Sequence, residues 1–187
     1  MKRHVGLLLL VLMLTRSAGA NGLDAVRGSA SVGYAKLFLS DSPGGSLSAS
    51  GGLDYPLRPG LRAGLAIGFH LLGTRSVQRG SLFANVDYSL FEVDLLAHWI
   101  PSRLGPVGRV SFGPAVMSAR AELSTSGGGA GLSDLAVERS AAGAALEVTL
   151  ISRSESPVRV GLEVGGRTAF LPGQDWTLAS ARLAFHY

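Results

Sequence analysis

Period-two alternation of apolar and polar residues is the feature of this sequence that most restricts its fold. In the segment LRAGLAIGFHLL, residues 61–72, apolar side chains occupy the odd positions, whereas Arg62, two glycines and His70 occupy even ones. Residues 157–170 repeat the pattern. Successive side chains on a β-strand point to opposite sides, so this alternation predicts strands with two chemically different faces. We therefore expect an all-β protein.

Eight such segments follow one another, separated by clusters of Gly, Pro, Ser and Asp, which are typical turn residues. Most of them reach the length of about 9–11 residues that a tilted strand needs to cross a membrane. An even number of antiparallel strands can close into a barrel without a free edge. The predicted strands are 27–38, 46–55, 61–72, 83–100, 107–121, 135–151, 157–170 and 176–187.

The connections between these strands alternate in character, as in up-and-down membrane barrels. Tight turns are predicted at 56–60, 101–106 and 152–157, longer loops at 73–81 and 124–134, and a short last connection at 171–176.

One predicted strand breaks its own pattern. Val86, Tyr88 and Leu90 lie on the opposite parity to Phe91 and Val93, although all five are apolar. A β-bulge near Ser89–Leu90 is expected to reconcile the two halves, because a bulge shifts the side-chain alternation by one residue.

The first twenty residues, MKRHVGLLLLVLMLTRSAGA, are predicted to be a cleaved signal peptide. Lys2 and Arg3 precede an apolar run over 5–14, and the small residues at 18–20 supply a cleavage site. The run is too short to cross about 30 Å of hydrocarbon as a helix, which argues against a membrane anchor. The mature domain is expected to span 21–187.

Charge and cysteine content exclude several classes of function. The chain has 17 Lys and Arg residues against 13 Asp and Glu, but three of the basic residues lie in the predicted signal peptide, which leaves 14 against 13. A nearly neutral domain lacks the basic surface of a nucleic-acid-binding protein, so no nucleic acid partner is expected. The absence of Cys excludes disulfide scaffolds, thiol catalysis and Cys-based zinc sites.

A soluble barrel and a membrane barrel differ in which parity meets water. In a soluble barrel the apolar parity fills the interior, whereas in a membrane barrel it faces lipid. The polar parity is rich in Gly, Ala and Ser, as the narrow interior of an eight-stranded cylinder requires. Its charges are mostly Arg and carboxylate, and Arg suits partly dehydrated pairing better than Lys. We therefore expect a lumen charge network of Arg62, Glu92, Asp94, Arg109, Glu147, Arg159, Glu163, Arg167 and Arg182.

Aromatic residues close to the predicted strand ends support the same orientation. Side chains of this kind form girdles at the two membrane interfaces of a barrel. The residues expected in these girdles are Tyr55, Trp99, Phe170, Trp176 and Tyr187.

The mature chain resembles the small outer-membrane β-barrels of Gram-negative bacteria, of the OmpA, OmpX and OmpW type. The resemblance rests on the export signal, the eight alternating segments, the alternating connections and the ending LASARLAFHY. In that ending, Leu183, Phe185 and Tyr187 resemble the C-terminal assembly signal, although the family more often ends on Phe. The resemblance implies an eight-stranded antiparallel up-and-down transmembrane β-barrel in the cell outer membrane. Its implied partners are outer-membrane lipids and the assembly machinery that recognises the C-terminal strand.

The expected role is structural or surface-interacting, with a plugged or very narrow polar lumen. No enzyme activity, cofactor or metal is expected. His70, His98 and His186 share the inner parity, but no two of them have the close spacing of a metal site. The segment SGGGAG, residues 126–131, lacks the Lys-Ser/Thr of a phosphate-binding loop. The sequence does not identify a solute or an extracellular partner.

The sequence is also compatible with two alternatives. The first is a secreted soluble barrel of lipocalin architecture that binds a small apolar ligand, with Leu65, Ile67, Phe69, Leu162 and Val164 turned inward. The second is a narrow passive channel, because small residues on the polar parity could leave a wet path through the barrel.

Overall fold

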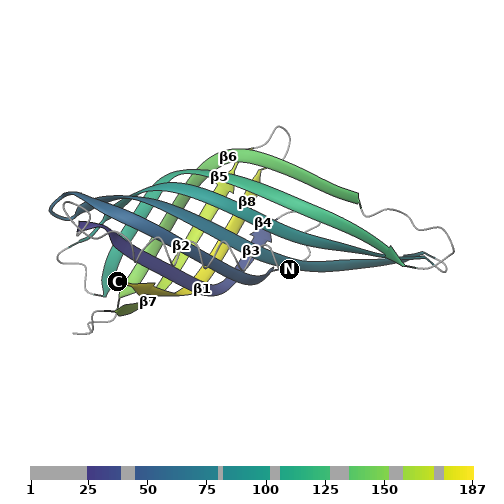
Figure 1. Ribbon diagram of the computed structural model, residues 1–187, viewed down its shortest axis with the longest axis horizontal. Helices are drawn as coiled ribbons and strands as arrows, with labels where there is room; N and C mark the ends of the chain where they lie inside the picture. Colours follow the sequence, from purple (N-terminus) through teal and green to yellow (C-terminus); the bar gives the residue numbers. More distant parts are fainter. Residues whose placement is uncertain are drawn as a thin grey trace.

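The computed structural model describes residues 25–38, 45–79, 82–101, 106–126, 135–151, 158–170 and 175–187. Eight strands in these ranges form one closed barrel in which each strand is antiparallel to both neighbours (Figure 1). The strands are β1 (Arg27–Phe38), β2 (Gly45–Arg58), β3 (Leu61–Arg79), β4 (Leu82–Trp99), β5 (Val107–Ser126), β6 (Leu135–Ile151), β7 (Arg159–Ala169) and β8 (Trp176–His186). Across the described ranges, no helix has the length and apolarity of a membrane-crossing segment.

The barrel closes where the last strand meets the first. β8 pairs with β1 over ten residues, with Val32 opposite Leu183. The main chain of Gly28 exchanges two hydrogen bonds with that of Tyr187, at 2.9 and 3.1 Å. The prediction of an eight-stranded antiparallel up-and-down barrel is confirmed, whereas the predicted signal peptide, 1–20, lies outside the described residues.

The barrel body carries its apolar parity on the outer wall. Leu65, Leu162 and Val164 are 45–49% exposed, whereas Arg167 and Arg182 in the lumen are 1% exposed. The soluble lipocalin-like alternative is therefore wrong, because it requires these apolar side chains inside and the arginines outside.

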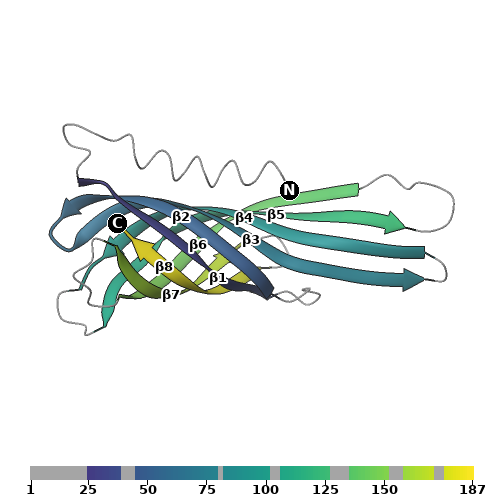
Figure 2. The same cartoon turned by 60° about the horizontal axis from the view of Figure 1, so that its bottom comes forward.

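Four strands continue well beyond the barrel body (Figure 2). β2 last pairs with β3 at His70, and β7 last pairs with β6 at Gly143. Beyond these points β3, β4, β5 and β6 pair only with one another, in the order β3-β4-β5-β6. We call this part the projecting sheet; it comprises residues 71–79, 82–90, 117–126 and 135–142. The predicted loop at 73–81 is thus wrong through Arg79, where β3 ends.

The inner and outer faces exchange their polarity in the projecting sheet. In the barrel body, even positions of β4 such as Glu92 and Asp94 are buried in the lumen, and so is Leu90. Continuing this alternation places Val86 and Tyr88 on the inner face and Asp87 on the outer face. The bulge predicted near Ser89–Leu90 is therefore wrong, because β4 keeps its parity and the polarity of its surroundings changes instead.

A bulge does occur at this level, on the neighbouring strand. The register between β3 and β4 shifts between Leu71 and Gly73, opposite Ser89 and Tyr88. Gly73 has φ of +94°, a left-handed conformation that residues with a Cβ rarely adopt.

An apolar plug fills the lumen at the end from which the sheet projects. Its buried members come from seven of the eight strands. They are Ala35, Leu37, Leu72, Leu90, Met117, Ala141, Ala169, Trp176 and Leu178. Trp176 is 7% exposed, so its assignment to the aromatic girdle is wrong; Tyr55, Trp99, Phe170 and Tyr187 are exposed as expected. Burial of this plug removes apolar side chains from water and closes the mouth of the barrel.

Candidate functional site

Seven of the nine residues predicted for the lumen charge network lie together in the middle of the barrel. Each is at most 7% exposed. They come from β4, β5, β6, β7 and β8, and we call them the charged belt: Glu92, Asp94, Arg109, Glu147, Glu163, Arg167 and Arg182. Three guanidinium groups thus face four carboxylates behind the apolar plug.

Arg167 bridges two strands across the lumen. Its Nη2 lies 3.1 Å from Asp94 Oδ2 on β4 and 2.9 Å from Glu147 Oε2 on β6. Its Nε lies 3.2 Å from Glu92 Oε2, and its Nη1 donates to Ser180 Oγ at 3.3 Å. Such forked pairing uses the fixed geometry of a guanidinium group, which explains why Arg occupies this position.

Arg182 and Arg109 complete the belt. Arg182 Nη2 lies 2.8 Å from Glu147 Oε2 and 2.6 Å from Glu163 Oε1. Arg109 Nη2 lies 3.2 Å from Glu163 Oε2 and 3.5 Å from Glu147 Oε1. Each carboxylate is thereby held by at least one cation, as burial of a charge demands.

Polar side chains connect the belt to the remaining three strands. Ser31 of β1 donates to Glu163 Oε1 at 3.3 Å and lies 2.7 Å from Ser50 of β2. His70 Nε2 of β3, which is fully buried, lies 3.3 Å from Glu92 Oε2. Neither serine was predicted as part of the charge network, although the inner parity of both in predicted strands was a usable signal. Contacts through the belt therefore link all eight strands across the lumen.

Two residues predicted for the network lie elsewhere. Arg62 pairs with Asp54, and its Nη2 donates to the carbonyl of Ala25 at 2.7 Å, near the end of the barrel where β1 begins and β8 ends. Arg159 is exposed because it is the first residue of β7, where the wall ends. Arg159 has the inward parity that was predicted for it. Its side chain is nevertheless exposed, because a side chain is enclosed only where the strand lies within the barrel wall.

The lumen leaves almost no open space. Between the belt and the terminal end lies a cavity of about 20 Å³, lined by groups such as Ser29, Ser50 and His98. A volume of this size has room for about one water molecule. Within the described ranges, no group of three or more His, Asp or Glu side chains is placed to hold a metal ion. The charged belt thus forms a polar core below an apolar plug.

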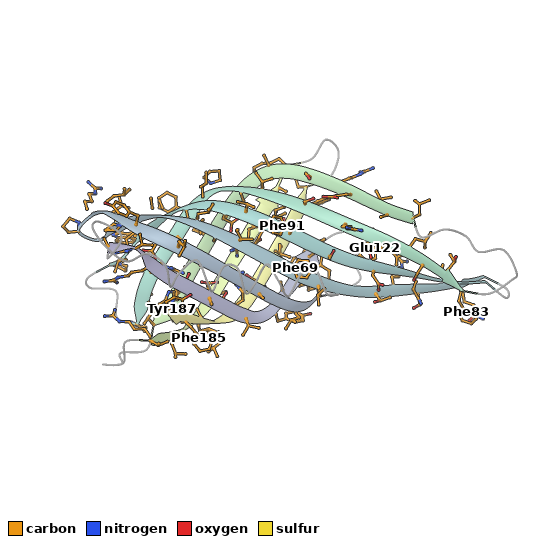
Figure 3. All side chains as sticks on the ribbon, viewed as in Figure 1. Phe69, Phe83, Phe91, Glu122, Phe185 and Tyr187 are labelled. Atoms are coloured by element: carbon orange, nitrogen blue, oxygen red, sulfur yellow. The ribbon has the colours of Figure 1, made fainter. Side chains whose placement is uncertain are left out.

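The outer face of the projecting sheet is a ladder of polar contacts between neighbouring strands. Ser76 Oγ donates to Asn85 Oδ1 at 2.7 Å, and Thr74 donates to Asp87. Ser118 Oγ donates to Glu138 Oε1 at 2.7 Å. Along β5 itself, Arg120 pairs with Glu122, whose position on the projecting sheet is labelled in Figure 3. This face suits water, in contrast to the apolar outer wall of the barrel body.

Comparison by sequence found no match, either among protein-family models or among curated proteins. Comparison by structure found small outer-membrane proteins that match almost over their full lengths. A major outer membrane protein from Thermus thermophilus aligns with a TM-score of 0.62 at 14% identity, over 87% of this chain and 98% of that chain. Neisserial surface protein A aligns with a TM-score of 0.58 at 15% identity, over 90% and 97%.

Ail, the attachment invasion locus protein of Yersinia pestis, aligns in its complex with the heparin analogue sucrose octasulfate. The TM-score is 0.51 at 12% identity, over 87% of this chain and 99% of that chain. At these identities the likeness concerns the fold. The chain therefore has the fold of the small eight-stranded outer-membrane β-barrels.

Proposed function

We propose that this protein is an integral outer-membrane barrel with a sealed lumen, whose working surface is the projecting sheet outside the cell. One observation carries the proposal: the outer wall changes from apolar to polar at a single level. On β5 the outward Val116 is 53% exposed, whereas the outward positions beyond it are Ser118, Arg120 and Glu122. An apolar wall that ends at one height is what a bilayer requires of the protein that spans it.

The start of β1 and the end of β8 set the proposed orientation of the barrel. A leader at 1–20 would export the chain, and the end of β8 would present the assembly signal of Leu183, Phe185 and Tyr187. In support, Leu183 and Tyr187 are 47% and 42% exposed on the outer wall, where the assembly machinery can reach them. Both strand termini, Arg27 and His186, then lie on the periplasmic side, and the projecting sheet lies outside.

The role we propose is surface interaction rather than transport or catalysis. The buried charges pair with one another and are separated from the outer mouth by the apolar plug. A solute would have to displace both the charged belt and the apolar plug to pass through the barrel. The projecting sheet, in contrast, offers two exposed faces and two unpaired strand edges within the described ranges.

Cysteine labelling on intact cells tests this proposal, because the chain has no cysteine of its own. Single Cys variants at Asp87 and Glu122 should react with a membrane-impermeant maleimide. Matched outward variants at Leu95 and Val116, lower on the same two strands, should remain unlabelled until detergent is added. Labelling of the variants at Leu95 and Val116 on intact cells would contradict the proposed membrane boundary.

A conductance measurement tests the sealed lumen separately. Refolded protein in a planar bilayer should show no steady conductance above that of the lipid alone. Stable ohmic openings would support the narrow channel and exclude a sealed lumen, whatever the labelling result.

A further inference from the structure

A cavity opens at the end of the barrel where β1 begins and β8 ends, and we call it the rim cavity. Its volume is about 380 Å³, which is in the range of small-molecule binding sites. Three guanidinium groups line it, and each comes from a different strand: Arg27 from β1, Arg58 from β2 and Arg62 from β3. Among the described residues, no carboxylate lines the rim cavity, so its lining is cationic.

The three arginines differ in what holds them. Arg62 is buried and pairs with Asp54, and its Nη2 donates to the carbonyl oxygens of Ala25 at 2.7 Å and Asp54 at 3.2 Å. Arg27 and Arg58 are exposed, and neither forms an ion pair with a carboxylate of the described residues. Arg27 is close enough to Arg62 for their like charges to repel one another. Arg27 and Arg58 are therefore left to pair with an anion from outside the chain.

The turn between β2 and β3 forms a fixed wall of the rim cavity. Gly60 has φ of +77°, and its carbonyl oxygen accepts a hydrogen bond from the main chain of Ile100 at 2.8 Å. Pro56 and Pro59 restrict the backbone on either side of Arg58. Binding then orders little backbone, which lowers the entropy cost of taking up a ligand.

The rim cavity borders the lipid-facing wall. Leu57, which lines it, is 60% exposed. Trp99 is 48% exposed, directly precedes Ile100 of the cavity lining, and is paired in register with Leu61. Exposed aromatic side chains at the end of a barrel wall mark the level of the membrane interface. A ligand can therefore place an anion in the rim cavity and apolar chains on the wall above it.

We propose that the rim cavity binds the phosphate group of an anionic phospholipid, whose acyl chains lie on the outer wall beside Leu57 and Trp99. The inference goes beyond the proposed function and rests on it only for the position of the barrel in the membrane. A phosphate group offers several acceptor oxygens, which match the forked N–H groups of Arg27 and Arg58. A zwitterionic head group also brings a cation, which meets like charges in the rim cavity, so an anionic lipid is preferred.

Trp99 reports on this site when W176F removes the other tryptophan of the chain. In vesicles of phosphatidylcholine, a small fraction of lipid with brominated chains quenches the tryptophan that it contacts. Brominated phosphatidylglycerol should bind beside Trp99 about two- to thirtyfold more strongly than brominated phosphatidylcholine, as expected for two exposed charge contacts. Native mass spectrometry of the wild type in detergent micelles containing both lipids should show the same preference without any tryptophan replacement.

Variants then assign the site. R27S/R58S should bind the two lipids about equally, whereas Arg62 is kept because it holds Asp54. R159S is the matched control and should keep the preference, because Arg159 is exposed at the same end of the barrel but does not line the rim cavity. Inorganic phosphate, added at constant ionic strength, should not displace the lipid, because it lacks the acyl chains that contact the wall.

Three results would overturn the inference. Equal binding of the two lipids, both to W176F and to the wild type, would mean that the rim cavity selects no anionic head group. An equal loss of preference in R159S and R27S/R58S would assign it to the overall charge of this end of the barrel. Displacement by inorganic phosphate would make the occupant a soluble anion. None of these results bears on the cysteine labelling of Asp87 and Glu122, so the proposed barrel would stand.

Discussion

Replacing Arg167 by methionine tests whether the charged belt holds the barrel together. Arg182 also contacts Glu92 and Glu147, so both carboxylates keep a cation when Arg167 is removed. Among the described residues, Asp94 has no other cation within 4.0 Å. The substitution therefore strands one buried carboxylate, and breaking a buried pair in this way costs about 3–5 kcal/mol.

The double variant R167M/D94N separates this cause from simple loss of packing. Removing the stranded charge should restore part of the free energy of unfolding, with a coupling of about 0.5–3 kcal/mol between the two sites. R120M removes an arginine from the exposed pair with Glu122 and should cost less than about 1 kcal/mol.

Urea-induced unfolding in lipid vesicles, followed by tryptophan fluorescence, measures the free energies of unfolding of the wild type, R167M, D94N, R167M/D94N and R120M. The role of the charged belt is refuted if R167M lowers the free energy of unfolding no more than R120M does. It is also refuted if R167M/D94N loses the sum of the two single losses, with no recovery.

Three further outcomes follow from the same structure. L95R places a charge on the lipid-facing wall and should lower the free energy of unfolding in vesicles by about 2–4 kcal/mol, whereas an arginine at Glu122 should change it little. G73A should lower the free energy of unfolding by about 1–2 kcal/mol, because Gly73 has a φ of +94° that residues with a Cβ rarely adopt. A Cβ added there meets no atom of a packed neighbour within 4 Å, so a full loss of folding would instead point to a packing role. Truncation of Tyr187 to alanine should lower the amount of heat-modifiable protein in outer-membrane fractions without altering refolding in vitro, and a refolding defect would argue against its role as a recognition signal.

Most of the barrel could be predicted because the membrane imposes one rule on every strand. Apolar residues must face lipid, so the alternation located all eight strands. Most strand ends were predicted to within a few residues, whereas β3 and β5 continue further than predicted. The same rule placed Glu92, Arg167 and Arg182 on the inner parity. Their pairing across the lumen could not be predicted, because it depends on depth and register, which alternation does not encode.

Two of the failures share one physical origin, which is that the rule reverses outside the bilayer. Val86, Tyr88 and Leu90 looked out of phase because the prediction assumed lipid along the whole strand. Residues 73–79 looked like a loop because a strand with water on its outer face needs polar residues there. Trp176 looked interfacial because it begins its strand, yet β8 begins at the level of the plug.

β8 supplies two of the side chains that complete the interior, Trp176 to the plug and Arg182 to the charged belt. Both layers remain unfinished until this last strand docks on β1. An intermediate of seven strands would expose the charged belt at an open seam, in contact with hydrocarbon. We therefore expect the barrel to close as it inserts, and a chain that stalls before β8 docks should be cut by proteases of the cell envelope.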